Sequence, residues 1–198
     1  MKKLIKNTLV LVILFTTLLG HANSSFKNSN DEKRTTLTLT DVKQGDELLI
    51  KDTHGIILYK EKIQNSGHYI KGFDLTELPD GDYFFELIKE MKIKIIPFNV
   101  TINEVTFKKD IESVIYKPLV KTEENKVYIS KLSLHRKPLE IKVYYHKNDT
   151  QDFNLIYTET IENTKSIGRI LNLDEKEKGH YKIIIKTEGR TFIDYAQF

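Results

Sequence analysis

The sequence contains no cysteine and no tryptophan, and it has only four prolines and nine glycines among 198 residues. The missing cysteines exclude disulfide bonds, thiolate metal sites and catalytic thiols, so the folded chain must depend on its hydrophobic core. No segment carries a sustained apolar stripe at helical spacing, which argues against a helical fold. No apolar run approaches the roughly 20 residues that a membrane-spanning helix needs.

Residues 1–22 have the three parts of a secretory signal peptide. A lysine-rich start is followed by an apolar run over residues 9–19, and a Gly-His-Ala motif ends at Ala22. We expect cleavage after Ala22 and export to the periplasm, the cell surface or the exterior. Since the apolar run is too short to cross a bilayer, we expect no membrane span after cleavage.

The formal net charge of +3 belongs to this segment. Without Lys2, Lys3 and Lys6, 28 basic residues face 28 acidic ones. A near-neutral chain lacks the basic excess that attracts polyanions such as nucleic acids. We therefore expect no nucleic-acid partner.

Two stretches of the chain repeat at an offset of 98 residues. Residues 57–63 (ILYKEKI) recur as residues 155–161 (LIYTETI), and the segment 73–83 recurs in its main features as 171–181. A fixed offset of this length indicates a duplicated structural unit.

From Thr35 onward, apolar residues alternate with polar ones, which is typical of half-buried antiparallel strands, and Gly- and Asp-containing turns separate the strands. Six or seven short strands in each repeat are the number expected of an immunoglobulin-like sandwich. We therefore predict an all-β chain of two tandem immunoglobulin/fibronectin-III-like antiparallel β-sandwiches. The expected boundaries are a signal peptide at 1–22, a flexible polar leader at 23–34, a first module at 35–107 and a second module at 108–198.

Two tyrosines follow glycine turns at the start of a late strand in each repeat. Tyr83 comes after Gly81, and Tyr181 comes after Gly179. This is the position of a tyrosine corner, in which the phenol hydrogen-bonds back to the main chain upstream. We expect a structural role for both side chains.

The sequence shows no catalytic, cofactor-binding or metal-binding constellation. Its serines lack a Gly-x-Ser-x-Gly context, and its histidines are scattered without the spacing that places two imidazoles on one metal ion. The turn at residues 80–82 (DGD) lacks the full ligand spacing of a calcium loop. We therefore predict that the protein is not an enzyme and binds no cofactor.

Two pairs of adjacent aromatic residues carry the remaining functional hint. In Phe84-Phe85 and Tyr144-Tyr145, one ring of each pair must face away from the core of a regular strand. The apolar register places Phe84 and Tyr144 outward. Exposed rings on a sandwich can stack on sugars or anchor a protein partner. Alternatively, they pack against the neighbouring module or cover strand edges.

The segment FDLTELPDGDYFFEL at residues 73–87, followed by Lys94-Ile95-Ile96, resembles secreted β-sandwich modules of Bacteroidota. These modules include the C-terminal sorting domains of type IX secretion cargo. The resemblance implies a sandwich fold and an exported protein. Sorting domains follow a large passenger, whereas the better-matching copy here is internal.

These observations predict an exported, non-catalytic β-sandwich protein that acts as a binding, adhesion or envelope-structural module, with a protein or glycan partner. One alternative is an accessory or sorting element of a type IX-like secretion pathway. Another is a small carbohydrate-binding protein or hydrolase, which requires carboxylates or aromatic rings that converge between the modules.

Overall fold

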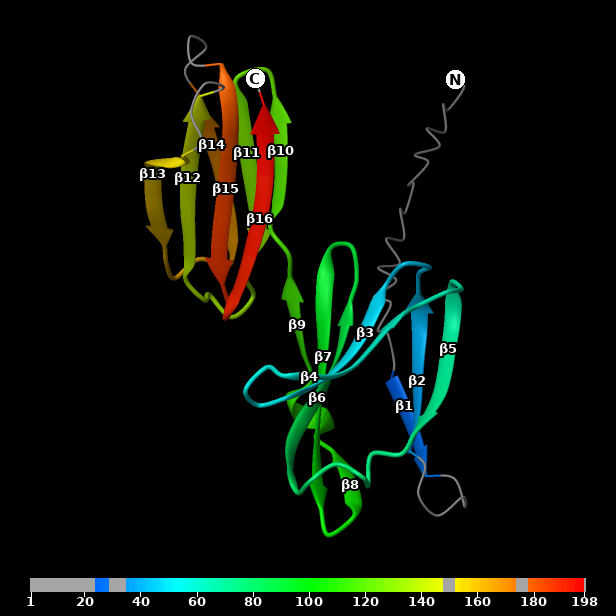
Figure 1. Ribbon diagram of the computed structural model, residues 1–198. Coiled ribbons are helices and arrows are strands. Elements are labelled where there is room, and N and C mark those ends of the chain that lie inside the picture. The colour runs from blue at the N-terminus through cyan, green and yellow to red at the C-terminus, as the bar shows by residue number, and fades with distance from the viewer. Residues whose placement is uncertain (1–23, 29–34, 148–151, 174–177, 198) are drawn as a thin grey trace, which may run out of the picture.

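The computed structural model describes residues 24–28, 35–147, 152–173 and 178–197, and for residues 24–28 it describes the backbone alone. Apart from one 3-10 turn at Lys109–Ile111, every regular element in this part of the chain is a strand. The strands form two bodies that are joined through strand β9 (Figure 1). The expected signal peptide at 1–22 lies outside the described residues.

The first module consists of two antiparallel sheets. The smaller sheet has the strand order β1 (Ser24–Asn28), β2 (Thr35–Val42), β5 (Gly67–Phe73). The larger sheet has the order β4 (Ile57–Lys62), β3 (Glu47–Asp52), β6 (Gly81–Ile88), β7 (Lys92–Thr101), β8 (Glu104–Phe107). Strand β9 (Ser113–Tyr116) also pairs with β7.

The second module repeats this topology. Its three-stranded sheet has the order β10 (Leu119–Glu123), β11 (Lys126–Leu132), β14 (Ser166–Asn172). Its four-stranded sheet has the order β13 (Asn154–Ile161), β12 (Leu139–Lys147), β15 (Gly179–Thr187), β16 (Arg190–Gln197). In both modules the first, second and fifth strands form one sheet, and the fourth, third, sixth and seventh form the other. This is the strand order of fibronectin type III domains, so the predicted fold class is confirmed.

Each module has its own hydrophobic core between its two sheets. Alternate residues of the strands point into the core, as the period-two pattern predicted. Phe85 and Phe98 are fully buried at the centre of the first core, and Tyr181, Ile183 and Ile185 occupy the centre of the second. The two clusters share no residue, so each sandwich buries apolar surface independently of the other.

Both modules carry the same β-bulge. The pairing of β3 with β4 shifts between Ile50 and Lys51, and the pairing of β12 with β13 shifts between Val143 and Tyr144. A bulge increases the local twist and turns an edge strand away from other sheet edges, which opposes aggregation. The duplication has therefore preserved a protective edge as well as a core.

The connection between the modules differs from the expectation of two sandwiches meeting at residue 107. Strands β8 and β9 lie along the free edge of β7, and the Lys117 amide donates to the Met91 carbonyl at 2.9 Å. Residues 113–116 therefore hydrogen-bond to the first module. Within the expected leader at 23–34, Ser24–Asn28 form strand β1 and pair with β2, whereas residues 23 and 29–34 lie outside the described part of the chain.

Tyr83 closes the turn that precedes β6. Its hydroxyl donates to the Pro79 carbonyl at 2.7 Å, and its ring stacks on Phe98 with centroids 5.6 Å apart. This is the geometry of a tyrosine corner. Tyr181 is buried at the equivalent place in the second module, with its ring centroid 5.0 Å from that of Tyr145. The carbonyl equivalent to that of Pro79 belongs to residue 177, which lies outside the described part of the chain.

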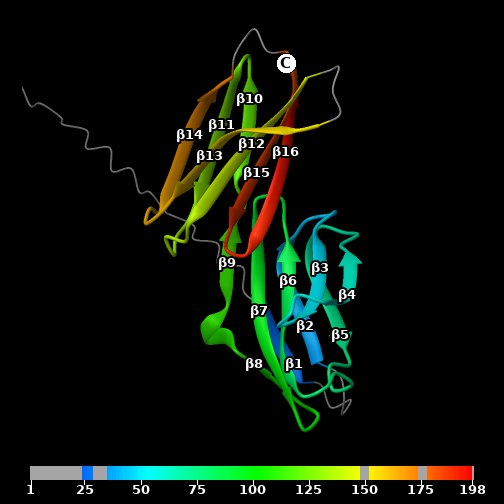
Figure 2. The same cartoon turned by 60° about the vertical axis from the view of Figure 1, so that its left-hand side comes forward.

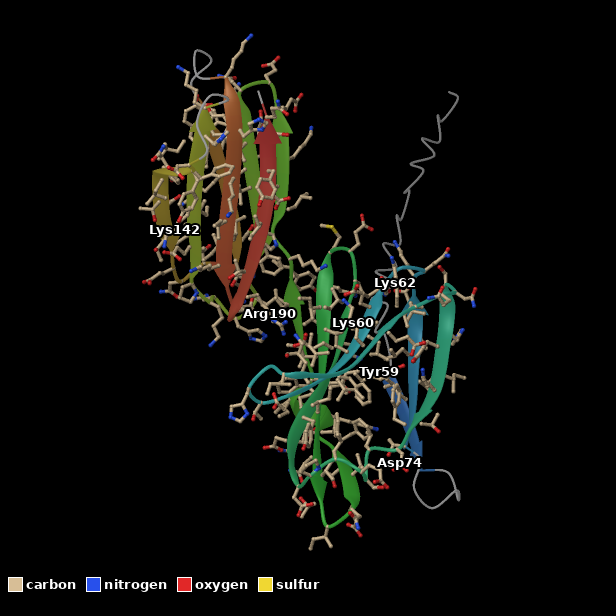
Figure 3. The ribbon with its side chains drawn as sticks, viewed as in Figure 1. Tyr59, Lys60, Lys62, Asp74, Lys142 and Arg190 are labelled. Atoms are coloured by element: carbon tan, nitrogen blue, oxygen red, sulfur yellow. The ribbon has the colours of Figure 1, made fainter. Side chains whose placement is uncertain are left out.

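A second duplicated feature joins the two sheets at one edge of each sandwich. In the first module, Glu61 on β4 accepts hydrogen bonds from the Tyr59 hydroxyl, from the Tyr69 hydroxyl at 3.0 Å and from Lys71 Nζ at 2.6 Å. Figure 3 labels Tyr59 at this edge. We call this group the carboxylate clasp. Burial on its own raises the pKa of Glu61, but the hydrogen bonds from Lys71 and the two tyrosines outweigh it and lower the pKa.

The clasp of the second module has the same design. Glu159 accepts a hydrogen bond from the Tyr157 hydroxyl at 2.8 Å, and its two carboxylate oxygens share the hydrogen of Arg169 Nε, each at 2.9 Å. Each of these residues lies 98 positions after its counterpart, with arginine in place of Lys71. The chemistry of the clasp, a tyrosine and a cation on one carboxylate, is therefore repeated with a different cation.

Replacing Glu61 by glutamine is expected to lower the free energy of unfolding by about 1 kcal/mol, because the clasp is partly exposed and its charged hydrogen bonds are screened. Urea unfolding at pH 7 measures this loss, with the exposed Glu77→Gln as the control. The difference in unfolding free energy between wild type and Glu61→Gln should shrink as the pH falls below the usual pKa of a glutamate. A carboxylate with a lowered pKa in the folded state stabilises the fold fully above its usual pKa, and this contribution is lost as the pH falls through the folded pKa. Equal midpoints for the two variants at pH 7 would contradict the role of the clasp.

Candidate functional site

The sheet β13-β12-β15-β16 presents a row of side chains on its outer face. The strand register pairs Leu155 with Tyr144, Tyr144 with Lys182, and Lys182 with Tyr195. Side chains of directly paired residues lie on the same face of a sheet. Because Ile183, the neighbour of Lys182, points into the core, the row points away from it.

The row and its neighbours form an exposed apolar surface. Tyr195 is 67% exposed, Leu155 is 51% exposed, and Ile193 on the next row is 48% exposed. Tyr144 is half-buried. Lys182 Nζ lies 5.8 Å from the ring centroid of Phe153, which adds a cation–π contact. We call this surface the tyrosine face; it comprises Tyr144, Phe153, Leu155, Lys182, Ile193 and Tyr195.

Lysines border the tyrosine face. Lys142 lies two positions before Tyr144 on β12, and Lys186 lies four positions after Lys182 on β15, so both point to the same side of the sheet as the tyrosine face. Lys142 Nζ is 2.8 Å from Glu140 Oε1 (Lys142 is labelled in Figure 3). The hydrogen bond from Lys142 lowers the pKa of Glu140. Two histidines lie at the far end of the sheet: the ring of His146 is 5.2 Å from that of Phe153 and 5.6 Å from that of His180.

The second predicted outward ring, Phe84, lies elsewhere. It is half-buried on β6 in the first module, between Lys51 and Pro97 in the register. The structure therefore places Phe84 and Tyr144 on the outer faces of different modules and does not bring them together. Their use in partner binding remains a prediction, and the two positions require separate tests.

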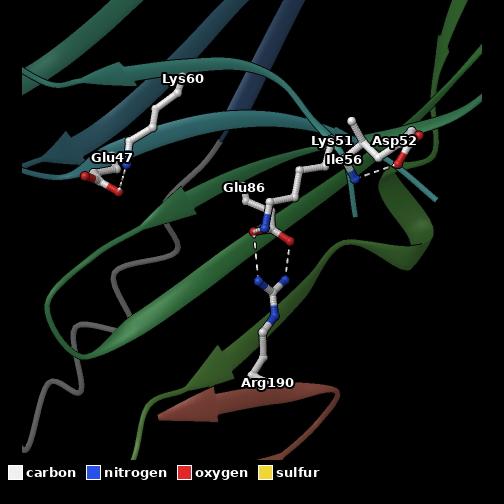
Figure 4. Close-up of polar contacts among 7 residues, drawn as sticks. All are labelled: Glu47, Lys51, Asp52, Ile56, Lys60, Glu86 and Arg190. Atoms are coloured by element: carbon white, nitrogen blue, oxygen red, sulfur yellow. Dashed lines mark hydrogen bonds and ion pairs between the residues drawn. The ribbon is translucent and has the colours of Figure 1, made fainter. Parts of the chain in front are cut away.

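Glu86, two residues after Phe84, lies on the outer side of the first module's larger sheet and is only 1% exposed. Its carboxylate pairs with both terminal nitrogens of Arg190 and lies 2.9 Å from Lys51 Nζ (Figure 4). Burial raises the pKa of Glu86, but the hydrogen bonds from Arg190 and Lys51 outweigh it and lower the pKa. On the adjacent strands, Leu49 of β3 and Ile95 of β7 are paired directly with Glu86.

Arg190 belongs to the second module and follows a tight turn. A loop of two residues, Glu188 and Gly189, connects β15 to β16, and both have positive φ, as in a type I′ hairpin. An ion pair within the second module also holds Glu188 in place, since its Oε1 lies 2.7 Å from the Nζ of the buried Lys131. The β15–β16 hairpin lies against the first module (Figure 2), and Arg190 makes the contact with Glu86. We call the group of Lys51, Glu86 and Arg190 the junction cluster.

A groove of about 680 Å³ lies beside the junction. Its lining includes Ile115 of the first module and His135, Lys137, Lys186 and Glu188 of the second. Glu188 is the one carboxylate among its described lining residues, and it is paired with Lys131. Glycoside hydrolysis uses two carboxyl groups that flank the bond to be cleaved. The described part of this groove lacks that arrangement.

The described residues contain no group of three or more histidine, aspartate or glutamate side chains placed to hold a metal ion. In the same part of the chain, no helix has the length and apolar character that a membrane crossing requires.

No protein-family model matches this chain, and no curated protein does. Among solved structures, it is similar to the BSP domain of a biofilm associated protein, with 11% identity and a TM-score of 0.28. It is also similar to the FN1–FN3 domains of chicken CNTN1, with 12% identity and a TM-score of 0.28. Each match covers 88% of this chain, which spans 28% of the first protein's chain and 62% of the second's. At these scores the matches carry no argument about function.

Proposed function

We propose that this chain is an exported, non-catalytic binding protein and that the tyrosine face is its contact surface. The observation that carries the proposal is the row Leu155, Tyr144, Lys182, Tyr195, which crosses a four-stranded sheet and leaves Tyr195 two-thirds exposed. Aromatic residues of this kind dominate the energetics of contact surfaces. The signal-like residues 1–22 support export.

The two modules differ in what their outer faces offer a partner. In the first module, Leu49, Ile93 and Ile115 are buried around Glu86 on the outer side of the larger sheet. In the second module, the corresponding side carries exposed Ile193 and Tyr195. This contrast supports different roles for the two modules. The outer face of the first module contacts the second module, and the outer face of the second module is available to bind the partner.

Replacing Tyr144 and Tyr195 together by alanine is expected to weaken partner binding by about tenfold or more, because truncation of one aromatic anchor costs about 1–2 kcal/mol. The mature chain from residue 23 serves as bait for envelope and culture fractions of the native organism. The amount of each captured component is then compared between variants.

Ile70→Ala is the matched control, since Ile70 is also 67% exposed and lies on the first module. The Ile70→Ala control should melt close to wild type, because changes at exposed positions cost about 0.5 kcal/mol or less. Tyr144 is half-buried, so the melting temperature of the double tyrosine variant is measured as well, and Tyr195→Ala alone tests the face at an exposed position. Capture that survives in the double tyrosine variant and in the control alike would overturn the tyrosine face as the contact surface.

A further inference from the structure

We propose that the tyrosine face binds an anionic polysaccharide, one that carries carboxylate or sulfate groups along its chain. This inference rests on the binding function proposed above and names the chemical class of the ligand. Three features carry it: the sign of the charge on this side of the sheet, the position of Lys182, and the spacing of the two tyrosines.

The outer side of the four-stranded sheet is cationic. The outward positions on β12 and β15 carry three lysines, Lys142, Lys182 and Lys186. They carry a single carboxylate, Glu140, which forms an ion pair with Lys142. Asp194 on β16 does not offset this charge, because it is paired with Ile183 and lies on the core side of the strand. Glu140 also lies opposite Lys186 in the register, but its ion pair within 4.0 Å is with Lys142, and no ion pair of Lys182 or Lys186 is found among the described residues. An anionic ligand complements this surface.

Lys182 lies at the centre of the tyrosine face, and this position argues against a protein partner. Its register neighbours are Tyr144 on one side and Tyr195 on the other. The centre of a protein–protein interface is desolvated and poor in lysine, whereas aromatic residues fill it. In the strand register Lys182 lies between the two tyrosines, and its ammonium lies 5.8 Å from the ring centroid of Phe153. A cation at this position suits a ligand that carries an anionic group beside its apolar patches, because a charged hydrogen bond is stronger than a neutral one.

The spacing of the rings suits a chain of sugar units. Tyr144 and Tyr195 lie on strands that flank β15, so their Cα atoms are separated by two strand spacings, about 10 Å. Pyranose rings present an apolar face that stacks on tyrosine, and their acidic substituents project from the ring edge. An extended polysaccharide can therefore place two sugars on the two rings while an acidic group meets Lys182.

The test compares a charged polymer with its neutral form. Polygalacturonate and fully methyl-esterified polygalacturonate share a backbone and differ in charge, and dextran sulfate and dextran form a second such pair. The mature chain from residue 23 is run by affinity electrophoresis in gels that contain each polymer. A single-stranded oligonucleotide and an acidic polypeptide, polyglutamate, represent the other polyanion classes.

We expect retardation by at least one charged polysaccharide, none by its neutral form, and a loss of binding as salt is raised. Tyr195→Ala and Lys182→Gln should each weaken binding about fivefold to tenfold. Lys121→Gln, an exposed lysine on β10 in the opposite sheet, should leave binding unchanged.

Three results would overturn the proposal: no retardation by either charged polysaccharide, equal retardation by charged and neutral forms, or tighter binding of the oligonucleotide or polyglutamate. If these results occur while the double tyrosine variant still loses the native partner, the tyrosine face stands as a contact surface and only the ligand class is wrong. If that variant keeps the native partner as well, the proposed function fails too.

Discussion

Replacing Arg190 by alanine is expected to release the second module from the first while both sandwiches stay folded. The substitution leaves the Glu86 carboxylate, which is 1% exposed, with Lys51 as its one remaining cation in the junction cluster. Removing one partner from a buried ion pair costs about 3–5 kcal/mol, because the other charge stays desolvated. The chain can avoid this cost by opening the junction and hydrating Glu86. The two separate cores do not depend on that contact.

Small-angle X-ray scattering measures this release as a larger radius of gyration and a smoother profile than wild type gives. Arg190→Lys is the matched control, because it keeps the charge but loses the paired hydrogen bonds to both carboxylate oxygens. Its effect should lie between those of wild type and Arg190→Ala. If Arg190→Ala scatters as wild type does, the junction cluster does not hold the modules together.

Acid should open the same junction in the unmodified protein. The folded pKa of Glu86 is lowered from its usual value of 4.5, so the carboxylate stabilises the closed junction above that pH. This contribution is lost as the pH falls through the folded pKa. Scattering between pH 7 and pH 3 should therefore show opening in wild type at acidic pH, whereas Arg190→Ala should be open throughout.

Replacing Gly179 by alanine is expected to lower the free energy of unfolding of the second module by about 3 kcal/mol, as overpacking at a fixed position does. A Cβ at this position would lie 2.5 Å from the His146 carbonyl oxygen and 2.7 Å from Cε2 of Tyr145. The carbonyl belongs to β12, which pairs with β15 along its full length, so the backbone cannot withdraw without loss of pairing.

Thermal unfolding measures this effect, with a decrease in the melting temperature of roughly 10 °C or more. Gly168→Ala is the control, because Gly168 lies in β14 of the same module and a Cβ there meets nothing within 4 Å. That variant should match wild type or gain a few tenths of a kcal/mol, since alanine restricts the unfolded chain. Equal melting temperatures for the two variants would show that the close approach at Gly179 is relaxed in solution.

Most of the fold could be predicted because the information is local. The alternation of apolar residues identified the strands, and the 98-residue offset matched Tyr59 with Tyr157 and Tyr83 with Tyr181, which hold equivalent places in the two modules. Strand β9 was missed as part of the first module because its four residues are strand-like in either module. Only its pairing with β7 decides to which one it belongs.

Less of the candidate site could be predicted. In β16 both phases of the alternation contain apolar side chains, with Phe192 and Ala196 in one and Ile193 and Tyr195 in the other. The alternating residues that face the core also include Asp194, whose pKa is raised by burial. A charged residue at a core-facing position makes the sequence pattern assign the wrong side of β16 to the core. The outward ring of Tyr144 was visible because it adjoins Tyr145.

Glu86 could not be identified from sequence for a different reason. It occupies an outward position on β6, where the alternation predicts a hydrated charge. It is buried because Arg190, 104 residues later, covers it. No local pattern encodes a contact between two domains at that separation.

The same separation orders the events of folding. The clasp contacts join residues 2 to 12 positions apart, whereas the junction cluster joins positions 104 apart. Closing so long a loop is entropically costly unless the intervening chain is already compact. In a chain made from its N-terminus, Glu86 also exists and can fold well before Arg190 does. We therefore expect the junction to form after the local contacts of the two sandwiches.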